Sequence, residues 1–242
     1  CSATVNHYKH LNFINKTFKN KIVIVEKPLF HKNLKLKNIK NKIYVSFNLR
    51  YDPLLQYLKK IIKNQKIWSL EVFCKSYLPN WRKTNYSKSY SAKKKLGGGV
   101  LLDLSHELDY VNWLFGEIDI NYVVNNKISD LNINSDDNFL LVGKSKNIKQ
   151  ILIHLNYYSK IENRSIFVTS KNLNFKADIK NKEILFLNNK LKKSYKTWKD
   201  KDYKKSFEKI IEDIVFDKKI KLPDYEFNLK VQKLISNIQN QR

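Results

Sequence analysis

A short run of β-branched residues near the start of the chain constrains the fold most. The run is Lys21-Ile-Val-Ile-Val-Glu26, and both faces of a strand built from it would be apolar, as in a buried strand of a parallel sheet. Pro28 ends the run, since proline cannot continue a central ladder. Apolar residues at helical spacing precede it in residues 5–19, and a second strand pattern follows at 42–47. Helix, strand, connection and strand in this order predict a parallel α/β unit.

The rest of the sequence changes in texture and predicts a second kind of architecture. We expect helices at 52–64 and 100–115, and two closing helices at about 200–217 and 224–240. The segments with strand patterns are 69–77, 119–126, 137–144, 149–157, 164–169, 173–178 and 183–187. Their connections are short and rich in turn residues, which favours a large, mostly antiparallel open sheet in an α+β domain. The Lys/Asn-rich stretches 32–42 and 188–205 are expected to be solvated loops or helix faces.

Charge and cysteine content limit the class of protein. The 242 residues carry a formal net charge of +25, which suggests nucleic acid or an anionic membrane as a partner. Only four of the 47 basic residues are arginine, the side chain that base edges prefer, and the lysines are spread over an Asn- and Ile-rich chain. We therefore interpret the charge as a compositional background and expect neither nucleic acid nor membrane as partner. With two cysteines, no apolar run of eighteen residues and no secretory signal pattern, a cytoplasmic protein is expected.

Three segments carry residues suited to proton chemistry. They are Thr4-Val-Asn6-His-Tyr-Lys-His10, Glu26-Lys27-Pro28, and the segment from Gly97-Gly-Gly99 to Asp109. The second lies at the carboxyl end of a predicted strand, where open α/β sheets bind ligands. In the third, Asp103 and His106 are three residues apart on a predicted helix and would share a face, where the carboxylate would raise the basicity of the imidazole. A lysine, a histidine and an aspartate around a small alcohol form a plausible proton-handling set for hydride transfer.

In this order and spacing the three segments resemble the Gfo/Idh/MocA family of nicotinamide-dependent oxidoreductases, whose pattern is roughly T-P-x-x-x-H, E-K-P, N-x-R and G-G-G-x-x-x-D-x-G-x-H-x-x-D. Asn48-Leu-Arg50 matches the third element. The stretch from Ser76 to Ser91 is similar to a subgroup associated with surface-sugar and nucleotide-sugar metabolism. The resemblance implies a Rossmann domain that binds NAD or NADP. It also implies a C-terminal sheet domain that forms the substrate side and a homo-oligomer interface.

The resemblance also implies roles for individual residues. The enzyme would transfer a hydride between the cofactor and a secondary hydroxyl or ketone of a sugar or sugar nucleotide. Lys27, His106 and Asp103 would be catalytic, and the Lys27–Pro28 bond is expected to be cis. Thr4, Asn6, His10, Glu26 and Lys27 would lie along the cofactor, while Arg50, Arg82, Tyr90, Asp103 and His106 would bind substrate. No metal site is expected.

Two departures from the family pattern qualify this assignment. His106 follows Asp103 by three residues, where the family spacing is four, which puts the geometry of Asp103 in doubt. The chain also has no G-x-G-x-x-G phosphate loop and no methionine. We therefore expect an N-terminally truncated member, with residues 1–50 as the C-terminal half of a Rossmann domain. Residues 51–242 would be the substrate and oligomerisation domain, and its last helices would pack back on the Rossmann part. The alternatives are a catalytically degenerate sugar-binding or oligomer-forming relative, and a nucleic-acid-binding protein.

Overall fold

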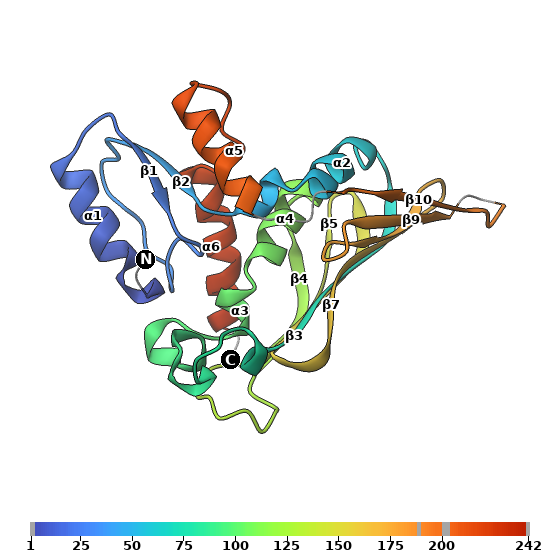
Figure 1. Ribbon diagram of the computed structural model, residues 1–242, viewed down its shortest axis with the longest axis horizontal. Helices are drawn as coiled ribbons and strands as arrows, with labels where there is room; N and C mark the ends of the chain where they lie inside the picture. Colours follow the sequence, from blue (N-terminus) through green and yellow to red (C-terminus); the bar gives the residue numbers. More distant parts are fainter. Residues whose placement is uncertain (1–2, 188–189, 200–203, 241–242) are drawn as a thin grey trace.

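Figure 1 shows the computed structural model of the chain, which describes residues 3–187, 190–199 and 204–240. A two-stranded parallel sheet lies on one side and an eight-stranded sheet on the other, with helices α3, α4 and α6 between them (Figure 1). The predicted combination of a small parallel α/β unit and a large, mostly antiparallel sheet is confirmed. None of the helices in the described ranges is long and apolar enough to cross a membrane.

The N-terminal unit consists of a 3-10 turn η1 (Thr4–Asn6), helix α1 (His7–Thr17) and strands β1 (Ile22–Val25) and β2 (Lys42–Val45), which pair in parallel. Its buried residues form a cluster of their own: Leu11, Leu29, Phe30, Leu36, Ile43, Val45, Phe47 and Tyr225. The prediction that both faces of β1 are buried is wrong for the described residues. Val23 and Val25 pack against the cluster, whereas Ile22 and Ile24 lie on the other face and are 42% and 41% exposed.

The large sheet has the strand order β10-β9-β8-β7-β3-β6-β5-β4. Among its described strands only the neighbours β3 and β6 are parallel, and the other neighbours are antiparallel. The strands are β3 (Ile67–Tyr77), β4 (Asp119–Asn126), β5 (Asn138–Ser145), β6 (Ile148–Asn156), β7 (Tyr158–Ser170), β8 (Asn174–Asp178), β9 (Glu183–Leu187) and β10 (Lys193–Thr197). Strand β10 lies in the Lys/Asn-rich stretch that was expected to be a loop or a helix face. Its sequence can be this polar because a strand at an exposed sheet edge needs no apolar face.

Of the helices that follow the N-terminal unit, α3, α4 and α6 lie between the two sheets (Figure 1). Asp52 caps α2 (Pro53–Ile61), since its Oδ1 accepts the backbone N–H of Leu54 at 2.9 Å. The other helices are α3 (Val100–Asp103), α4 (His106–Phe115), α5 (Lys204–Val215) and α6 (Tyr225–Asn240), and the 3-10 turns are η2 (Asn48–Tyr51), η3 (Leu78–Asn80), η4 (Tyr86–Lys88), η5 (Tyr90–Ala92) and η6 (Lys94–Leu96). The start of the helix expected at 200–217 lies outside the described residues, and the single helix expected at 100–115 is two helices.

Helix α6 contacts both parts of the structure. The hydroxyl of Tyr225, at its start, accepts the backbone N–H of Leu36 at 2.7 Å in the N-terminal unit. Val231 and Ile235, further along, belong to the large core beneath the eight-stranded sheet. The same helix therefore fixes the N-terminal unit against the sheet domain, while the domain boundary at residue 50 stays a prediction.

Candidate active site

The three glycines before α3 let two other segments approach its first turn. A Cβ atom on Gly98 would lie 2.1 Å from the carbonyl oxygen of Tyr90, and Gly99 has φ of +122° with the carboxylate of Asp136 against it. Asp136 Oδ2 accepts the N–H of Leu101 at 3.1 Å and its backbone oxygen accepts the N–H of Val100 at 2.9 Å. The loop containing Tyr90 is thereby held against the start of α3, whose last residue is Asp103.

The helix breaks after Asp103 because Lys27 takes the place of a helical donor. The ammonium group of Lys27 donates to the backbone oxygen of Asp103, and the N–H of Glu107 bonds to Leu104 instead, at 3.3 Å. A new helix, α4, then starts at His106. The expectation that Asp103 and His106 share one face of a continuous helix is therefore wrong. The break follows from the same contact that joins the E-K-P segment to the glycine-rich segment.

The carboxylate of Asp103 is held by a tyrosine rather than by His106. The hydroxyl of Tyr157, which is fully buried, donates to Asp103 Oδ2 at 2.6 Å, and Trp81 packs edge-on against the Tyr157 ring. Burial, and next the charge of Asp103, raise the pKa of Tyr90 to about 12. Tyr157 was missed from the sequence because it is the last residue of the predicted strand 149–157 and belongs to no motif.

Lys27 and His106 both occupy environments that disfavour their charged forms. Burial lowers the pKa of Lys27 below its ordinary value, although Asp103, Glu107 and Glu26 act in the opposite direction. Burial, followed by the positive charges of Lys27 and Arg164, lowers the pKa of His106 well below 6.5. The expected rise in His106 basicity from Asp103 is thus replaced by a fall. The low basicity makes His106 neutral at pH 7.

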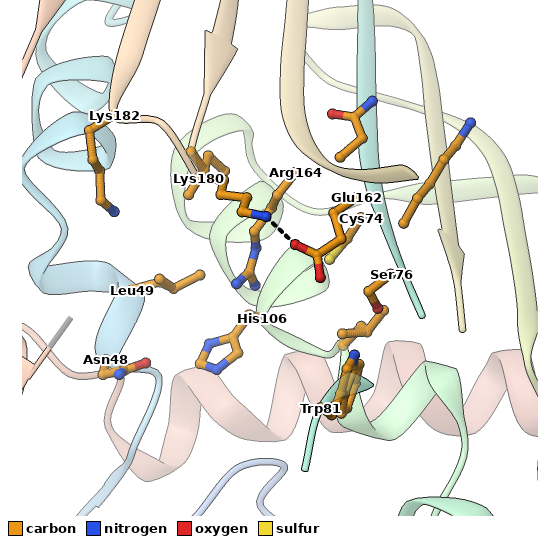
Figure 2. A pocket seen from close by; sticks show the side chains of 14 residues that line it. Asn48, Leu49, Cys74, Ser76, Trp81, His106, Glu162, Arg164, Lys180 and Lys182 are labelled. Atoms are coloured by element: carbon orange, nitrogen blue, oxygen red, sulfur yellow. Dashed lines mark hydrogen bonds and ion pairs between the residues drawn. The ribbon is translucent and has the colours of Figure 1, made fainter. Parts of the chain in front are cut away.

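His106 lines a cavity of about 500 Å³ between α4 and the sheet (Figure 2). Its Nδ1 is buried and has no hydrogen-bond partner among the described residues, and the ring meets Phe47 edge-on at 5.4 Å. Nε2 is therefore the nitrogen available to a molecule in the cavity. The cavity is lined by Asn48, Leu49, Cys74, Lys75, Ser76, Trp81, Leu104, His106, Glu162, Asn163, Arg164, Ile179, Lys180 and Lys182.

The sequence missed the cationic wall of this cavity. Arg164, Lys180 and Lys182 come from β7 and the segment between β8 and β9, and Figure 2 shows them opposite Asn48 and His106. No motif marks them, since they are dispersed among many other basic residues. Strand alternation is the one sequence pattern that indicates an inward-facing Arg164, because it places Arg164 on the same face of β7 as the buried Ile166.

The remaining predicted substrate residues lie outside this cavity. Arg50 is buried, and its Nε and Nη2 donate to the two carboxylate oxygens of Asp109 at 2.9 and 2.7 Å. That bidentate pair ties Arg50 to α4 within the protein, and a role of Arg50 in substrate binding stays a prediction. Arg82 lies 5.3 Å from the centre of the Tyr90 ring and is exposed. Tyr90 lies near Asp103, whose charge adds to the effect of burial in raising the pKa of the tyrosine.

Two of the five predicted cofactor residues, His10 and Glu26, line a second cavity, of about 390 Å³, beside α1 and β1. His7, which has no predicted role, also lines the cavity and is buried, and its Nδ1 lies 3.0 Å from the backbone oxygen of Pro28. Thr4 is buried behind Gly97 and Asn6 is exposed at the start of α1. The Lys27–Pro28 bond is cis, as expected.

Comparisons with known proteins match the chain to oxidoreductases. Residues 59–178 match a family described as "Oxidoreductase family, C-terminal alpha/beta domain" of the Gfo/Idh/MocA type. YteT of Bacillus subtilis (strain 168), which is named as an oxidoreductase, is 28% identical over 118 residues. That match spans 45% of this chain and 28% of YteT.

Solved structures share the fold over nearly the whole chain. An NAD binding oxidoreductase from Klebsiella pneumoniae has a TM-score of 0.79 at 16% identity, covering 100% of this chain and 78% of its own. The WlbA dehydrogenase from Bordetella pertussis, solved with NADH and UDP-GlcNAcA, has a TM-score of 0.74 at 15% identity, covering 99% and 75%. A levoglucosan dehydrogenase in complex with NADH has a TM-score of 0.78 at 17% identity, covering 99% and 76%.

Proposed function

Since this chain belongs to the Gfo/Idh/MocA oxidoreductase family, we propose that it forms the catalytic and substrate-binding part of an NAD(P)-dependent dehydrogenase that acts on a sugar or sugar nucleotide. The observation that carries the proposal is the hydrogen bond between Lys27 and the backbone oxygen of Asp103. These residues are 76 positions apart, and their contact brings the strand-end lysine to the glycine-rich helix next to His106. The solved relatives with NADH and with sugar-type ligands support the same class of reaction.

The residues present fit the nicotinamide end of a dinucleotide. The lining of the cavity between α1 and β1 includes Glu26, which directly follows the carboxyl end of β1, where α/β sheets bind nucleotides, and His10 supplies a second polar group. Lys27 follows directly at the end of the same strand. When bound there, NAD(P) would supply the acceptor or donor for a hydride. The diphosphate end lies outside the proposal, because the 242 residues contain no G-x-G-x-x-G.

Lys27 and His106 would handle the proton and the charge on the substrate oxygen. Nε2 of His106, which is neutral at pH 7, can take the proton of a substrate hydroxyl in the oxidative direction and return it in the reductive direction. The ammonium of Lys27 would stabilise the negative charge that develops on that oxygen. Asp103 holds Lys27 through its backbone oxygen, and its own carboxylate is fixed by Tyr157.

The assignment can be tested with the full product of the gene that contains this chain. Reduction of NAD and NADP would be followed spectrophotometrically with a panel of sugars, sugar acids and sugar nucleotides. We expect turnover with at least one compound and a loss of 100-fold or more in kcat/KM for Lys27→Ala and for His106→Ala. Lys149→Ala, an exposed lysine on β6, is the matched control and should retain full activity.

Two results would contradict the proposal. Wild-type kcat/KM in both Lys27→Ala and His106→Ala would remove these residues from catalysis. Binding of a sugar with no turnover in either direction would favour the degenerate, sugar-binding alternative over the enzyme.

A further inference from the structure

The cations that line the His106 cavity are arranged with their carboxylate partners behind them. Arg164 is paired with Glu107, which is fully buried, while the Arg164 side chain is 27% exposed. Nε and Nη2 of Arg164 lie 2.8 and 2.7 Å from the same oxygen of Glu107. Both contacts lie on one edge of the guanidinium, so the N–H groups of Nη1 are left to face the cavity. Glu107 is thus a support that holds this edge in a fixed orientation.

A second cation repeats the arrangement. Lys182 pairs with Asp52, and of the two side chains Lys182 is the more exposed, at 11% against 4%. Asp52 is occupied at its other oxygen as the cap of α2, since Oδ1 accepts the N–H of Leu54. Lys182 lines the cavity and Asp52 does not. A molecule in the cavity therefore meets the positive member of each pair first.

The acidic residue in the cavity lining is at its solvent side. Glu162 pairs with Lys180, and their side chains are 41% and 58% exposed (Figure 2). Water screens this pair much more than it screens Arg164 and Lys182. Lys75 and Asn163 come from positions of β3 and β7 that alternate with the inward-facing Cys74 and Arg164. The inner part of the cavity thus has Arg164, Lys182, the neutral His106 and the buried thiol of Cys74 as its titratable groups, and no carboxylate of the described residues lines it there.

We propose that the substrate carries an acidic group, a carboxylate or a phosphate, and that Arg164 binds it next to His106 with Lys182 as the second cation; this assignment rests on the proposed dehydrogenase function. A guanidinium edge that is already oriented loses little entropy when it binds an oxyanion, and its planar donors suit the two oxygens of such a group. The neutral polar side chains of the cavity, Asn48 and Ser76, are left for sugar hydroxyls.

The proposal is tested by calorimetric titration of the protein with matched sugar pairs that differ in one acidic group. The pairs are D-glucuronate and D-glucose, D-galacturonate and D-galactose, D-glucose 6-phosphate and D-glucose, and UDP-glucuronate and UDP-glucose. We expect the acidic member to bind at least tenfold more tightly in one or more pairs, which corresponds to about 1.4 kcal/mol. The first two pairs and the phosphate pair tell a carboxylate from a phosphate.

Variants show whether Arg164 reads the acidic group. Arg164→Gln should reduce the preference at least tenfold, whereas Lys176→Gln should leave it unchanged. Lys176 is the matched control because it is an exposed cation on the neighbouring strand β8, over the Phe167 ring on the other face of the sheet. If Arg164→Gln does not fold, the double variant Arg164→Gln/Glu107→Gln removes both charges of the buried pair and should show the same loss.

Each outcome separates this proposal from the dehydrogenase proposal. Tight binding of acidic sugars without reduction of NAD(P) would support the acidic subsite while removing the enzyme function. Turnover of neutral sugars, with no preference for the acidic member of any pair, would overturn the subsite while keeping the enzyme. A preference that survives in Arg164→Gln, or no preferential binding in all four pairs, would also overturn it.

Discussion

The hydroxyl of Tyr157 donates a 2.6 Å hydrogen bond to Oδ2 of Asp103, and both side chains are buried. Asp103 thereby has two functions at once: its backbone oxygen receives Lys27 and its carboxylate is anchored in the sheet domain. The bond links the turn between β6 and β7 to the end of α3. A residue without any motif thus fixes the position of the proposed catalytic lysine.

Replacing Tyr157 by phenylalanine should disturb both stability and catalysis. The change keeps the ring against Trp81 but removes one hydrogen-bond donor from a buried carboxylate, which then retains Tyr90 as a partner. Because hydrogen bonds to charged groups contribute roughly 1.5–3 kcal/mol, we expect a loss of about 2 kcal/mol in the free energy of unfolding. Urea denaturation measures this loss. In the proposed enzyme we also expect a kcat/KM reduced about tenfold or more, since Asp103 positions Lys27.

Tyr158→Phe is the control for this variant. The neighbouring hydroxyl donates to a neutral amide oxygen, that of Asn138, at 2.9 Å, and it is only partly buried. We expect a loss of about 1 kcal/mol or less and normal kinetics. Equal effects of the two substitutions on kcat/KM would show that Asp103 needs no anchor.

The buried ion pair between Arg50 and Asp109 should be essential for stability. The side chains are 5% and 2% exposed, and the pair joins η2 to the helix that begins with His106. Arg50→Gln leaves an uncompensated carboxylate in the core, so we expect a loss of about 3–5 kcal/mol, measured by chemical denaturation.

An exposed ion pair provides the comparison. Lys230 and Glu117 are 62% and 69% exposed, and Lys230→Gln should leave the unfolding midpoint unchanged because solvent screens the pair. If Arg50→Gln were as stable as Lys230→Gln, the argument that Arg50 serves the fold would fail.

The lowered pKa of His106 predicts a pH dependence of stability with a definite sign. The unfolded chain binds a proton at His106 near pH 6.5, and the folded chain binds it only at lower pH, so the unfolding free energy falls as pH drops below 6.5. One such group accounts for at most about 1.4 kcal/mol per pH unit. Denaturation of the wild type and of His106→Gln between pH 5 and pH 8 measures it as the difference between their slopes.

The comparison with His106→Gln is needed because two other histidines act in the same direction. Burial lowers the pKa of His31 and His154 as well, and both are unchanged in the variant. Imidazole nitrogen NMR gives a direct check, since His106 should stay neutral at pH 6. A charged His106 at that pH would contradict its assigned environment.

Local sequence patterns predicted most of the fold because its elements have clear periodicity. The strand predicted at 119–126 is β4 (Asp119–Asn126), and α6 (Tyr225–Asn240) is the predicted helix 224–240 without its first residue. Strand β10 was not predicted because an exposed edge strand carries no alternation of apolar and polar residues. The helix break after Asp103 was not predicted because it depends on Lys27, a residue 76 positions away in the sequence.

Only the site residues that lie within sequence motifs could be predicted. Lys27, Asp103 and His106 lie in motif segments, and the structure brings them together. Tyr157, Arg164 and Lys182 approach them through the pairing of β3, β6 and β7, and no local pattern records which strands become neighbours. The three cations of the cavity wall could not be singled out from the sequence, because the chain carries more than forty other lysine and arginine residues.

Gly98 should tolerate no side chain, and its replacement tests how the glycine-rich segment is built. A Cβ atom there would lie 2.1 Å from the carbonyl oxygen of Tyr90 and 2.5 Å from that of Ser91, both of which are backbone atoms that cannot rotate away. We expect Gly98→Ala to lower the unfolding free energy by about 2 kcal/mol or more, within the range for overpacking.

Gly116→Ala is the control for the Gly98 variant. Gly116 has φ of +93° but no atom within 4 Å of an added Cβ, so only backbone strain of about 1–2 kcal/mol is expected. Because Gly98 packs the Tyr90 loop against α3, the Gly98 variant alone should also lower the pKa of Tyr90 from about 12 toward 10, which ultraviolet titration of tyrosinate would detect. Equal stability of the two variants would show that the loop does not rest on the glycine.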